Sequence, residues 1–153
     1  MSSGKRATIR GGRLESNIAS ELEMLGYERI WPPSLIFAMK DMGQPVYAQQ
    51  VVVGSDIYGK KHHVDFLLFN PMKHPNGLVI ECKWQSSSGS VEEKFPFLVA
   101  NINKGTYDAI IILDGGGYTP GAERWLRGMA GHMRLRHVFS MGEFSKYASQ
   151  GSI

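Results

Sequence analysis

Residues 63–85 read HVDFLLFNPMKHPNGLVIECKWQ and contain two apolar segments separated by a polar connection. Residues 63–69 alternate between two faces, and residues 78–85 do the same, which is typical of β-strands packed on a core. The pair Asn76-Gly77 tolerates positive φ and closes the connection between the two segments. We therefore predict an antiparallel hairpin, and the remaining elements are organised around it.

The sequence on both sides extends this hairpin into one α/β domain with a mixed central sheet flanked by helices. Apolar residues recur at helical spacing over residues 13–25, and residues 109–113 are continuously apolar, as in a strand buried on both faces. Ser90 and Glu93 have the spacing of a capping box, whereas Pro96 indicates a kink or a later helix start. The predicted order is a helix at 13–25, strands at 47–53, 63–69 and 78–85, a helix ending near 105, a strand at 109–113, a helix at 120–133, a strand at 137–139 and a terminal helix that Ser140 and Glu143 cap.

The composition indicates a single domain over residues 1–153. The chain has 153 residues, of which 42% are hydrophobic and 20% are charged, as in ordinary globular proteins. Cys82 is the single cysteine, so an internal disulfide is excluded and a reducing compartment fits best. No apolar run approaches the ~20 residues that cross a bilayer, and the N-terminus lacks the apolar stretch of a secretory signal. We expect a cytoplasmic protein that does not contact a membrane.

The net charge of +3 is unevenly distributed along the chain. Residues 1–12 form a basic N-terminal arm, because four basic residues precede the first acidic residue, Glu15: Lys5, Arg6, Arg10 and Arg13. A second basic cluster contains Arg124, Arg127, Arg134 and Arg136. Such clusters favour polyanions through counterion release, but surface Lys and Arg also maintain solubility. Charge alone therefore leaves nucleic-acid contact and simple solubility as alternatives of equal weight.

Polar side chains gather on one face of the segment at 78–85. Side chains two residues apart share a face, so Glu81, Lys83 and Gln85 project together, while Cys82 projects the opposite way. Hairpin pairing brings Asp65 to within about 5 Å of the Glu81 position. Two adjacent carboxylates repel each other unless a cation or a shared proton compensates, and a divalent metal is the simplest compensation.

This donor set is typical of sites for hard divalent ions. Mg²⁺, or Mn²⁺ as its substitute, prefers carboxylate oxygens together with waters and phosphate oxygens. We predict that Asp65 and Glu81 are metal ligands, with the backbone carbonyl of Cys82 as a further ligand. Lys83 would orient or deprotonate the attacking water, and Gln85 would hold the water or the DNA backbone. The expected chemistry is hydrolysis at phosphate.

Simpler interpretations of single residues are also open. Glu-x-Lys alone occurs in many surface strands that carry a harmless cross-strand ion pair. Glu15 lies either at the rim of the core or in solvent, where it would interact favourably with the helix dipole. For His62 and His63 we do not expect a paired metal site, because adjacent residues face opposite ways, and we expect both in a surface loop.

At Val64-Asp65 and Glu81-Cys82-Lys83 the sequence resembles the PD-(D/E)XK nuclease superfamily. The resemblance implies a restriction endonuclease-like αβββαβ core over about residues 13–113. In this superfamily the first helix often carries a glutamate near the metal, which Glu15 matches. Gln85 matches members, including Holliday-junction resolvases, in which a glutamine follows the lysine by two residues. Val64 departs from the proline that the family name expects, at a position without direct metal contact.

The resemblance implies a Mg²⁺-dependent endonuclease that hydrolyses DNA phosphodiester bonds, with Glu15 as an outer or second-metal ligand. The small chain favours structure-directed or weakly sequence-specific cleavage, as in junction resolution or repair. The alternatives are a restriction-type sequence-specific endonuclease and a non-catalytic DNA-binding subunit that retains the fold. Cleavage of both strands of a duplex further implies a homodimer, and the helix carrying Trp125 is a candidate interface.

Overall fold

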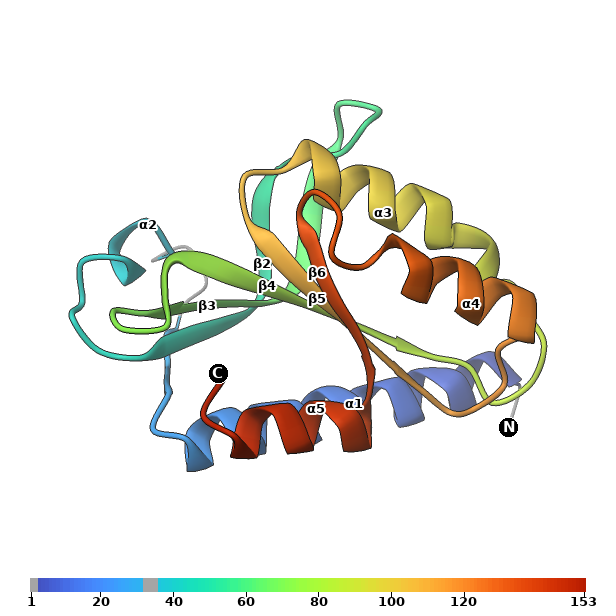
Figure 1. Cartoon of the computed structure of the whole chain (residues 1–153), viewed down its shortest axis with the longest axis horizontal. Helices are drawn as coiled ribbons and strands as arrows, with labels where there is room; N and C mark the ends of the chain where they lie inside the picture. Colours follow the sequence, from blue (N-terminus) through green and yellow to red (C-terminus); the bar gives the residue numbers. More distant parts are fainter. Residues whose placement is uncertain (1–2, 32–35) are drawn as a thin grey trace.

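The computed structural model describes residues 3–31 and 36–153, with side chains from residue 12 onward in those ranges. A single six-stranded sheet with the order β1-β2-β3-β4-β5-β6 lies between two layers of helices (Figure 1). α1 and α5 cover one face of this sheet, and α3 and α4 cover the other. The arrangement confirms the predicted α/β class with a mixed sheet flanked by helices.

The sheet is mixed because its two halves are connected differently. β2, β3 and β4 form an antiparallel meander, whereas β4, β5 and β6 run parallel and are joined through helices. The strands are β1 Glu28–Arg29, β2 Val46–Ser55, β3 Lys61–Asn70, β4 His74–Trp84, β5 Asp108–Asp114 and β6 Leu135–Ser140. The helices are α1 Ser3–Met24, α2 Ile36–Met39, the 3-10 turn η2 Glu92–Lys94, α3 Phe95–Lys104, α4 Pro120–Met129 and α5 Met141–Ser149.

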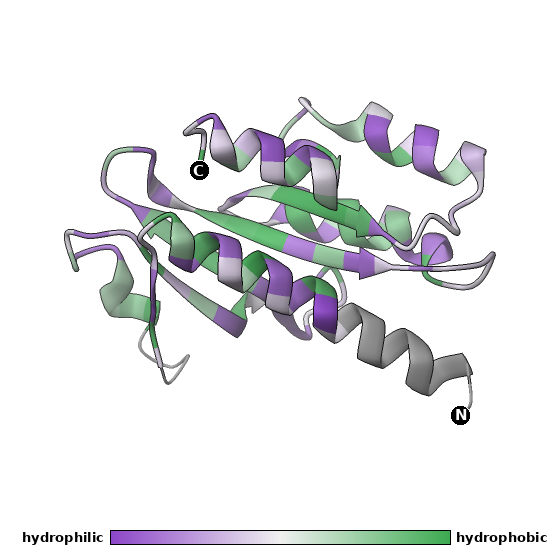
Figure 2. Ribbon diagram, turned by 90° about the horizontal axis from the view of Figure 1, so that it is seen from below, coloured by the Kyte–Doolittle hydropathy of each residue, from purple (hydrophilic) through white to green (hydrophobic). Residues whose placement is uncertain are grey.

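Two hydrophobic cores hold the helices on the sheet. Alternate residues of β5 enter opposite cores, so Ile110 and Ile112 pack with α1 and α5 while Ile111 and Leu113 pack with α3 and α4. The buried stripe of α1 consists of Leu14, Ile18 and Leu22, as its spacing predicts. Figure 2 shows apolar residues along the strands and polar residues on the outward sides of the helices. None of the helices in the described part of the chain is both long and apolar enough to span a membrane.

Several element boundaries differ from the predictions. α1 begins at Ser3 instead of Arg13, so the expected basic arm at 1–12 is helical from Ser3; the arm's side chains before residue 12 lie outside the described part. The glycines of the arm disfavour a helix locally, and this low propensity concealed the continuation. Residues 32–35, between β1 and α2, also lie outside the described residues.

The boundaries of the last three helices confirm some of the predictions and correct others. α3 begins at Phe95 with Pro96 in its first turn, preceded by η2, so the later of the two predicted starts is confirmed and Ser90 caps nothing. α4 ends at Met129, before the predicted Met133, because the following backbone is extended at Ala130. The capping box of Ser140 and Glu143 at the start of α5 is present as predicted.

Candidate active site

The strands of the central hairpin separate where the acidic residues begin. Paired residues of β3 and β4 run from Asn70 opposite His74 to Phe66 opposite Ile80. Continuing that register places Asp65 opposite Glu81. Asp65 instead accepts a hydrogen bond through Oδ2 from the backbone N–H of Cys82 at 2.8 Å. The carboxylate of Asp65 thus replaces a backbone partner at the point of divergence and is fixed there.

A distortion in β2 supplies a second support for the same carboxylate. Gln50 has a positive φ of 54°, which is uncommon for a residue other than glycine. Its Nε2 donates to Glu15 Oε2 at 3.1 Å and to Asp65 Oδ1 at 3.3 Å. Ala48 and Val51 enter the same core although they are three residues apart, so strand alternation is broken between them. The distortion turns the Gln50 amide toward the acidic residues, and it connects α1 to β3.

Sequence reasoning did not identify Gln50. Residues 48–53 read AQQVVV, and neither glutamine carries a signal of positive φ or of a functional site. Only the register of β2 against β3 brings this side chain opposite Asp65. Glu15, in contrast, lies half-buried at the margin of the α1 stripe, as the helical periodicity predicts.

Glu81 is the most buried acidic residue of the site, with 3% of its surface exposed. Burial raises the pKa of Glu81 well above its usual range, and the neighbouring Asp65 raises it further, while Lys83 opposes both effects. Burial and Asp65 also raise the pKa of Glu15. The carboxyl groups of Glu15, Asp65 and Glu81 therefore form one electrostatic cluster. The positive charge of Lys83 offsets only part of the repulsion among them.

Lys83 is the cationic partner of this cluster. It follows Glu81 by two residues on β4 and lines a pocket beside α3 together with Val91, Lys94, Phe95 and Leu98. Cys82 packs instead toward the core of α1 and α5, and burial raises the pKa of its thiol. The predicted alternation is confirmed for Glu81, Cys82 and Lys83, and a nucleophilic role of the Cys82 thiol is disfavoured.

His62 and His63 lie within β3, so the expectation that they are loop residues is wrong. The strand begins at Lys61, two residues before the predicted start, so both histidines lie inside it. His62 Nε2 lies 3.9 Å from Glu81 Oε1. Burial lowers the pKa of His62. His62 is thus an additional member of the site that sequence reasoning assigned elsewhere.

Gln85 follows the end of β4 and belongs to a different network. Its Nε2 donates to Glu92 Oε1 at 2.9 Å and to the Gly117 carbonyl at 3.1 Å, and its Oε1 accepts from the Glu92 N–H at 3.3 Å. Thr119 donates to the same glutamate through its hydroxyl. The structure therefore brings Glu15, Asp65, Glu81 and Lys83 together, while the Gln85 amide joins the loop after β4 to the loop after β5.

Gly117 makes this joining of loops possible, and its replacement is expected to be costly. A Cβ at Gly117 would lie 2.2 Å from the Ser86 carbonyl carbon and 2.2 Å from the Ser87 nitrogen. We expect Gly117→Ala to lower the free energy of unfolding by about 1–3 kcal/mol, measured by urea denaturation. Gly121→Ala is the control, because no atom lies within 4 Å of the added Cβ. A change within about 0.5 kcal/mol for Gly117→Ala would contradict the close packing.

The donor set of the site fits a hard divalent cation. Among the side chains that the structure describes, no group of three or more His, Cys, Asp or Glu meets the geometry of a metal site. Two carboxylates, one carbonyl and waters are nevertheless a sufficient donor set for Mg²⁺, which usually retains several waters. Burial first and the neighbouring Asp65 second raise the pKa of Glu81, and a cation between the two carboxyl groups would relieve their repulsion.

The fold and the site define a class of protein. The chain is an α/β domain in which one strand of an antiparallel pair supplies an aspartate and the other supplies Glu-x-Lys, beside a glutamate on the first helix. A family model described as a PD-(D/E)XK nuclease superfamily domain matches residues 6–152, and the chain belongs to this superfamily. Membership confirms the predicted family and supports a nuclease-type function, and nucleases of this superfamily generally use divalent metals. Neither the curated proteins nor the solved structures contain a match to the chain.

Proposed function

We propose that the protein is a divalent-metal-dependent endonuclease that hydrolyses DNA phosphodiester bonds, with Mg²⁺ as its ion and Mn²⁺ as a substitute. The observation that carries this proposal is the convergence of Asp65 and Glu81 beside Lys83 at the divergence of β3 and β4. A buried pair of like charges is costly for a fold, and it is useful where a cation and a phosphate bind.

Asp65 and Glu81, with the backbone carbonyl of Cys82, would hold the ion, and Glu15 would act from the outer side or at a second ion. When bound, a divalent ion polarises the phosphate and lowers the pKa of a coordinated water. The Cys82 N–H and the Gln50 amide fix the Asp65 carboxylate before any ligand arrives. Such fixed positions reduce the reorganisation that is needed in the transition state.

Lys83 would orient or deprotonate the attacking water. Its amine follows Glu81 by two residues, and its positive charge lowers the pKa of that carboxyl group. Gln85 would act on the substrate through the loop that it fixes, whose exposed residues 86–90 follow the catalytic strand. Cleavage would be structure-directed or weakly sequence-specific in the cytoplasm. A homodimer that meets through α4, where Trp125 is 41% exposed, would cut both strands.

Nicking of supercoiled plasmid tests this function. We expect the wild-type protein to nick the plasmid with Mg²⁺ and to leave it intact with EDTA, and we expect Asp65→Ala to be inactive. Asp41→Ala removes an exposed carboxylate after α2 and should retain activity. Absence of cleavage of every DNA form with Mg²⁺ and Mn²⁺ would favour the non-catalytic DNA-binding subunit. Comparison of a four-way junction with linear duplex would separate structure-directed from restriction-type cleavage.

A further inference from the structure

The tip of the β2–β3 hairpin is firmly braced although it is exposed. Asp56 Oδ1 accepts hydrogen bonds from the backbone N–H groups of Tyr58 at 2.8 Å and Lys60 at 3.0 Å, which closes the turn. The Ile57 N–H donates to Asn101 Oδ1 on α3 at 2.9 Å. Lys104 Nζ, also on α3, donates to the carbonyls of residues 55 and 56 at 3.0 Å. The turn is therefore held by its own carboxylate and by two side chains of the neighbouring helix.

Two aromatic rings are presented to solvent by this brace. The ring of Tyr58 stacks on the ring of Phe97 of α3, with centroids 5.4 Å apart and planes inclined by 22°. Tyr58 is 73% exposed and Phe97 is 37% exposed. The two rings pack on each other, and the outer face of Tyr58 remains available. A braced, exposed aromatic ring offers a planar contact surface at a reduced cost in conformational entropy.

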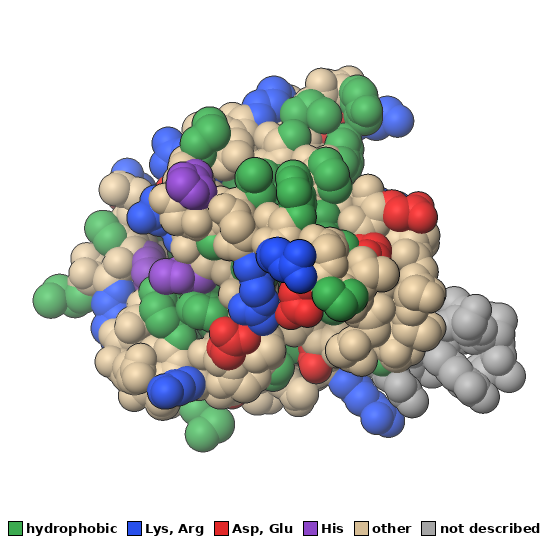
Figure 3. Space-filling model, turned by 45° about the vertical axis from the view of Figure 1, so that its right-hand side comes forward, with side chains coloured by type: hydrophobic (Ala, Val, Ile, Leu, Met, Phe, Trp, Pro, Cys, Tyr) green, Lys and Arg blue, Asp and Glu red, His purple; other side chains and the backbone are tan. Residues whose placement is uncertain are grey.

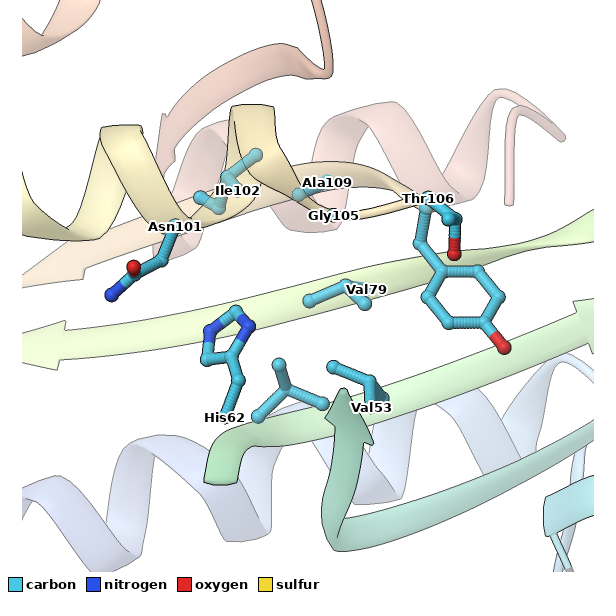
Figure 4. Close-up of a pocket in the computed structure, with 10 residues that line it drawn as sticks. Val53, His62, Val79, Asn101, Ile102, Gly105, Thr106 and Ala109 are labelled. Carbon is cyan, nitrogen blue, oxygen red and sulfur yellow. The ribbon is translucent and has the colours of Figure 1, made fainter. Parts of the chain in front are cut away.

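This aromatic pair lies close to the candidate active site. Tyr58 precedes His62 by four residues, which is at most roughly 13 Å of extended backbone. His62 reaches Glu81 at 3.9 Å. Asn101, which binds the hairpin tip, also lines the pocket that contains the His62 imidazole (Figure 4). Asn101 and His62 thus link the hairpin tip to the acidic cluster.

The charges around the aromatic pair complement a polyanion. The exposed side chains that follow Tyr58 include Lys60, Lys61 and His63, whereas Asp56, the only acidic residue of the turn, is buried and hydrogen-bonded. Lys94 extends the basic side chains toward Lys83, although Glu93 beside it is also exposed. Figure 3 shows basic, acidic and histidine side chains gathered on one face together with hydrophobic groups. Aromatic rings among basic residues are typical of surfaces that bind unpaired nucleotides.

We propose that Tyr58, supported by Phe97, stacks against an unpaired base of a DNA strand beside the phosphate that is cleaved. The inference rests on the proposed nuclease function and specifies its substrate class as DNA with unpaired nucleotides, such as a bulge or a frayed branch. In a continuous duplex the bases stack on one another, so no base face is available to Tyr58. The basic residues of the hairpin contact the phosphate backbone of any DNA form. The aromatic pair distinguishes DNA with unpaired bases from a continuous duplex.

Binding and base stacking can be measured without cleavage in the Asp65→Ala background. The probes are a duplex with one bulged 2-aminopurine and the same duplex fully paired, because fluorescence of 2-aminopurine is quenched when an aromatic ring stacks on it. We expect Tyr58→Ala to weaken binding of the bulged DNA by about 5- to 100-fold. Binding of the paired duplex should change less than about 2-fold, since the lysines are retained. The quenching on binding should disappear with Tyr58→Ala and persist with Tyr58→Trp.

Met72→Ala is the matched control, because Met72 is 90% exposed in the turn at the other end of β3 and should leave both affinities unchanged. Equal weakening for both DNAs, or none, would overturn the stacking role. Loss of a dimer in Tyr58→Ala would assign the pair to a contact between copies and would also overturn it. If plasmid nicking fails but discrimination of the bulge is observed, the nuclease proposal fails alone. If nicking occurs and Tyr58→Ala binds the bulge normally, only the stacking inference fails.

Discussion

Lys83→Ala is expected to lower the rate of DNA cleavage by about 10²- to 10⁴-fold, the usual contribution of a positioned acid-base group. Binding of the divalent ion should be retained or slightly strengthened, because the acidic cluster loses a competing positive charge. The measurements are single-turnover cleavage of a labelled duplex and calorimetric titration with Mn²⁺. Loss of cleavage together with retained ion binding would assign Lys83 to the attacking water.

Lys83→Arg distinguishes the two roles that the amine could have. An arginine keeps the positive charge but is not deprotonated in proteins, so it can orient a water or a phosphate without acting as a base. A cleavage rate of Lys83→Arg close to that of the wild type would assign an electrostatic role to Lys83. A rate as low as that of Lys83→Ala would assign proton transfer. Lys94 lines the same pocket as Lys83, so Lys94→Ala is the control. We expect it to change the cleavage rate by less than about 10-fold. A similar loss for both lysines would contradict the special position of Lys83.

The fold was largely predictable because its main signals are local. Alternation within 63–69 and 78–85 depends only on which face of a strand meets a core, and the structure extends these strands without changing their faces. The apolar run at 109–113 likewise became a fully buried strand. The start of α1 was not predictable, because glycines in the first turns lower the local propensity and the continuation depends on the remainder of the helix.

The candidate site was only partly predictable. Glu81 and Lys83 share a strand, so their common face follows from the period of a strand, and Asp65 follows from the hairpin register. Gln50 and His62 reach the site through contacts between strands. Gln50 carries no signal in the sequence, and the sequence placed His62 in a surface loop because its pairing across the strands was not visible. Gln85 shows the opposite case: its spacing predicts a place beside Lys83, but the strand ends at Trp84 and hydrogen bonds to the following loops capture its side chain.

Glu81→Gln is expected to have opposite effects on stability and on activity. In the folded protein the pKa of Glu81 is raised above its ordinary value of 4.5, chiefly by burial and then by Asp65. The folded state therefore holds the proton more tightly than the unfolded chain. This contribution to stability is complete below about pH 4.5, and it is lost as the pH rises through the folded pKa. In EDTA, wild-type stability from this group consequently falls with rising pH, and the glutamine variant avoids the loss.

At pH 8 in EDTA we expect Glu81→Gln to raise the free energy of unfolding by about 1–3 kcal/mol, because an amide replaces a buried charge beside Asp65. Lowering the pH toward 4.5 should shrink the difference, because the folded state binds the Glu81 proton more tightly than the unfolded chain does. With saturating Mg²⁺ the order should reverse. An ion at 100 times its Kd stabilises the wild type by about 2.7 kcal/mol, and the variant has lost a ligand for it. DNA cleavage by the variant should fall by about 10³-fold.

Urea denaturation with and without Mg²⁺ measures the reversal. Glu93→Gln is the control, because it removes an exposed carboxylate in η2 that has no buried carboxylate beside it among the described residues. The same sign of effect in EDTA and in Mg²⁺ would contradict Glu81 as a ligand. Stabilisation in EDTA without loss of cleavage would confine Glu81 to a structural position. The reversal matters because burial alone explains a destabilising carboxylate, and only a bound cation explains why its removal becomes harmful when Mg²⁺ is present.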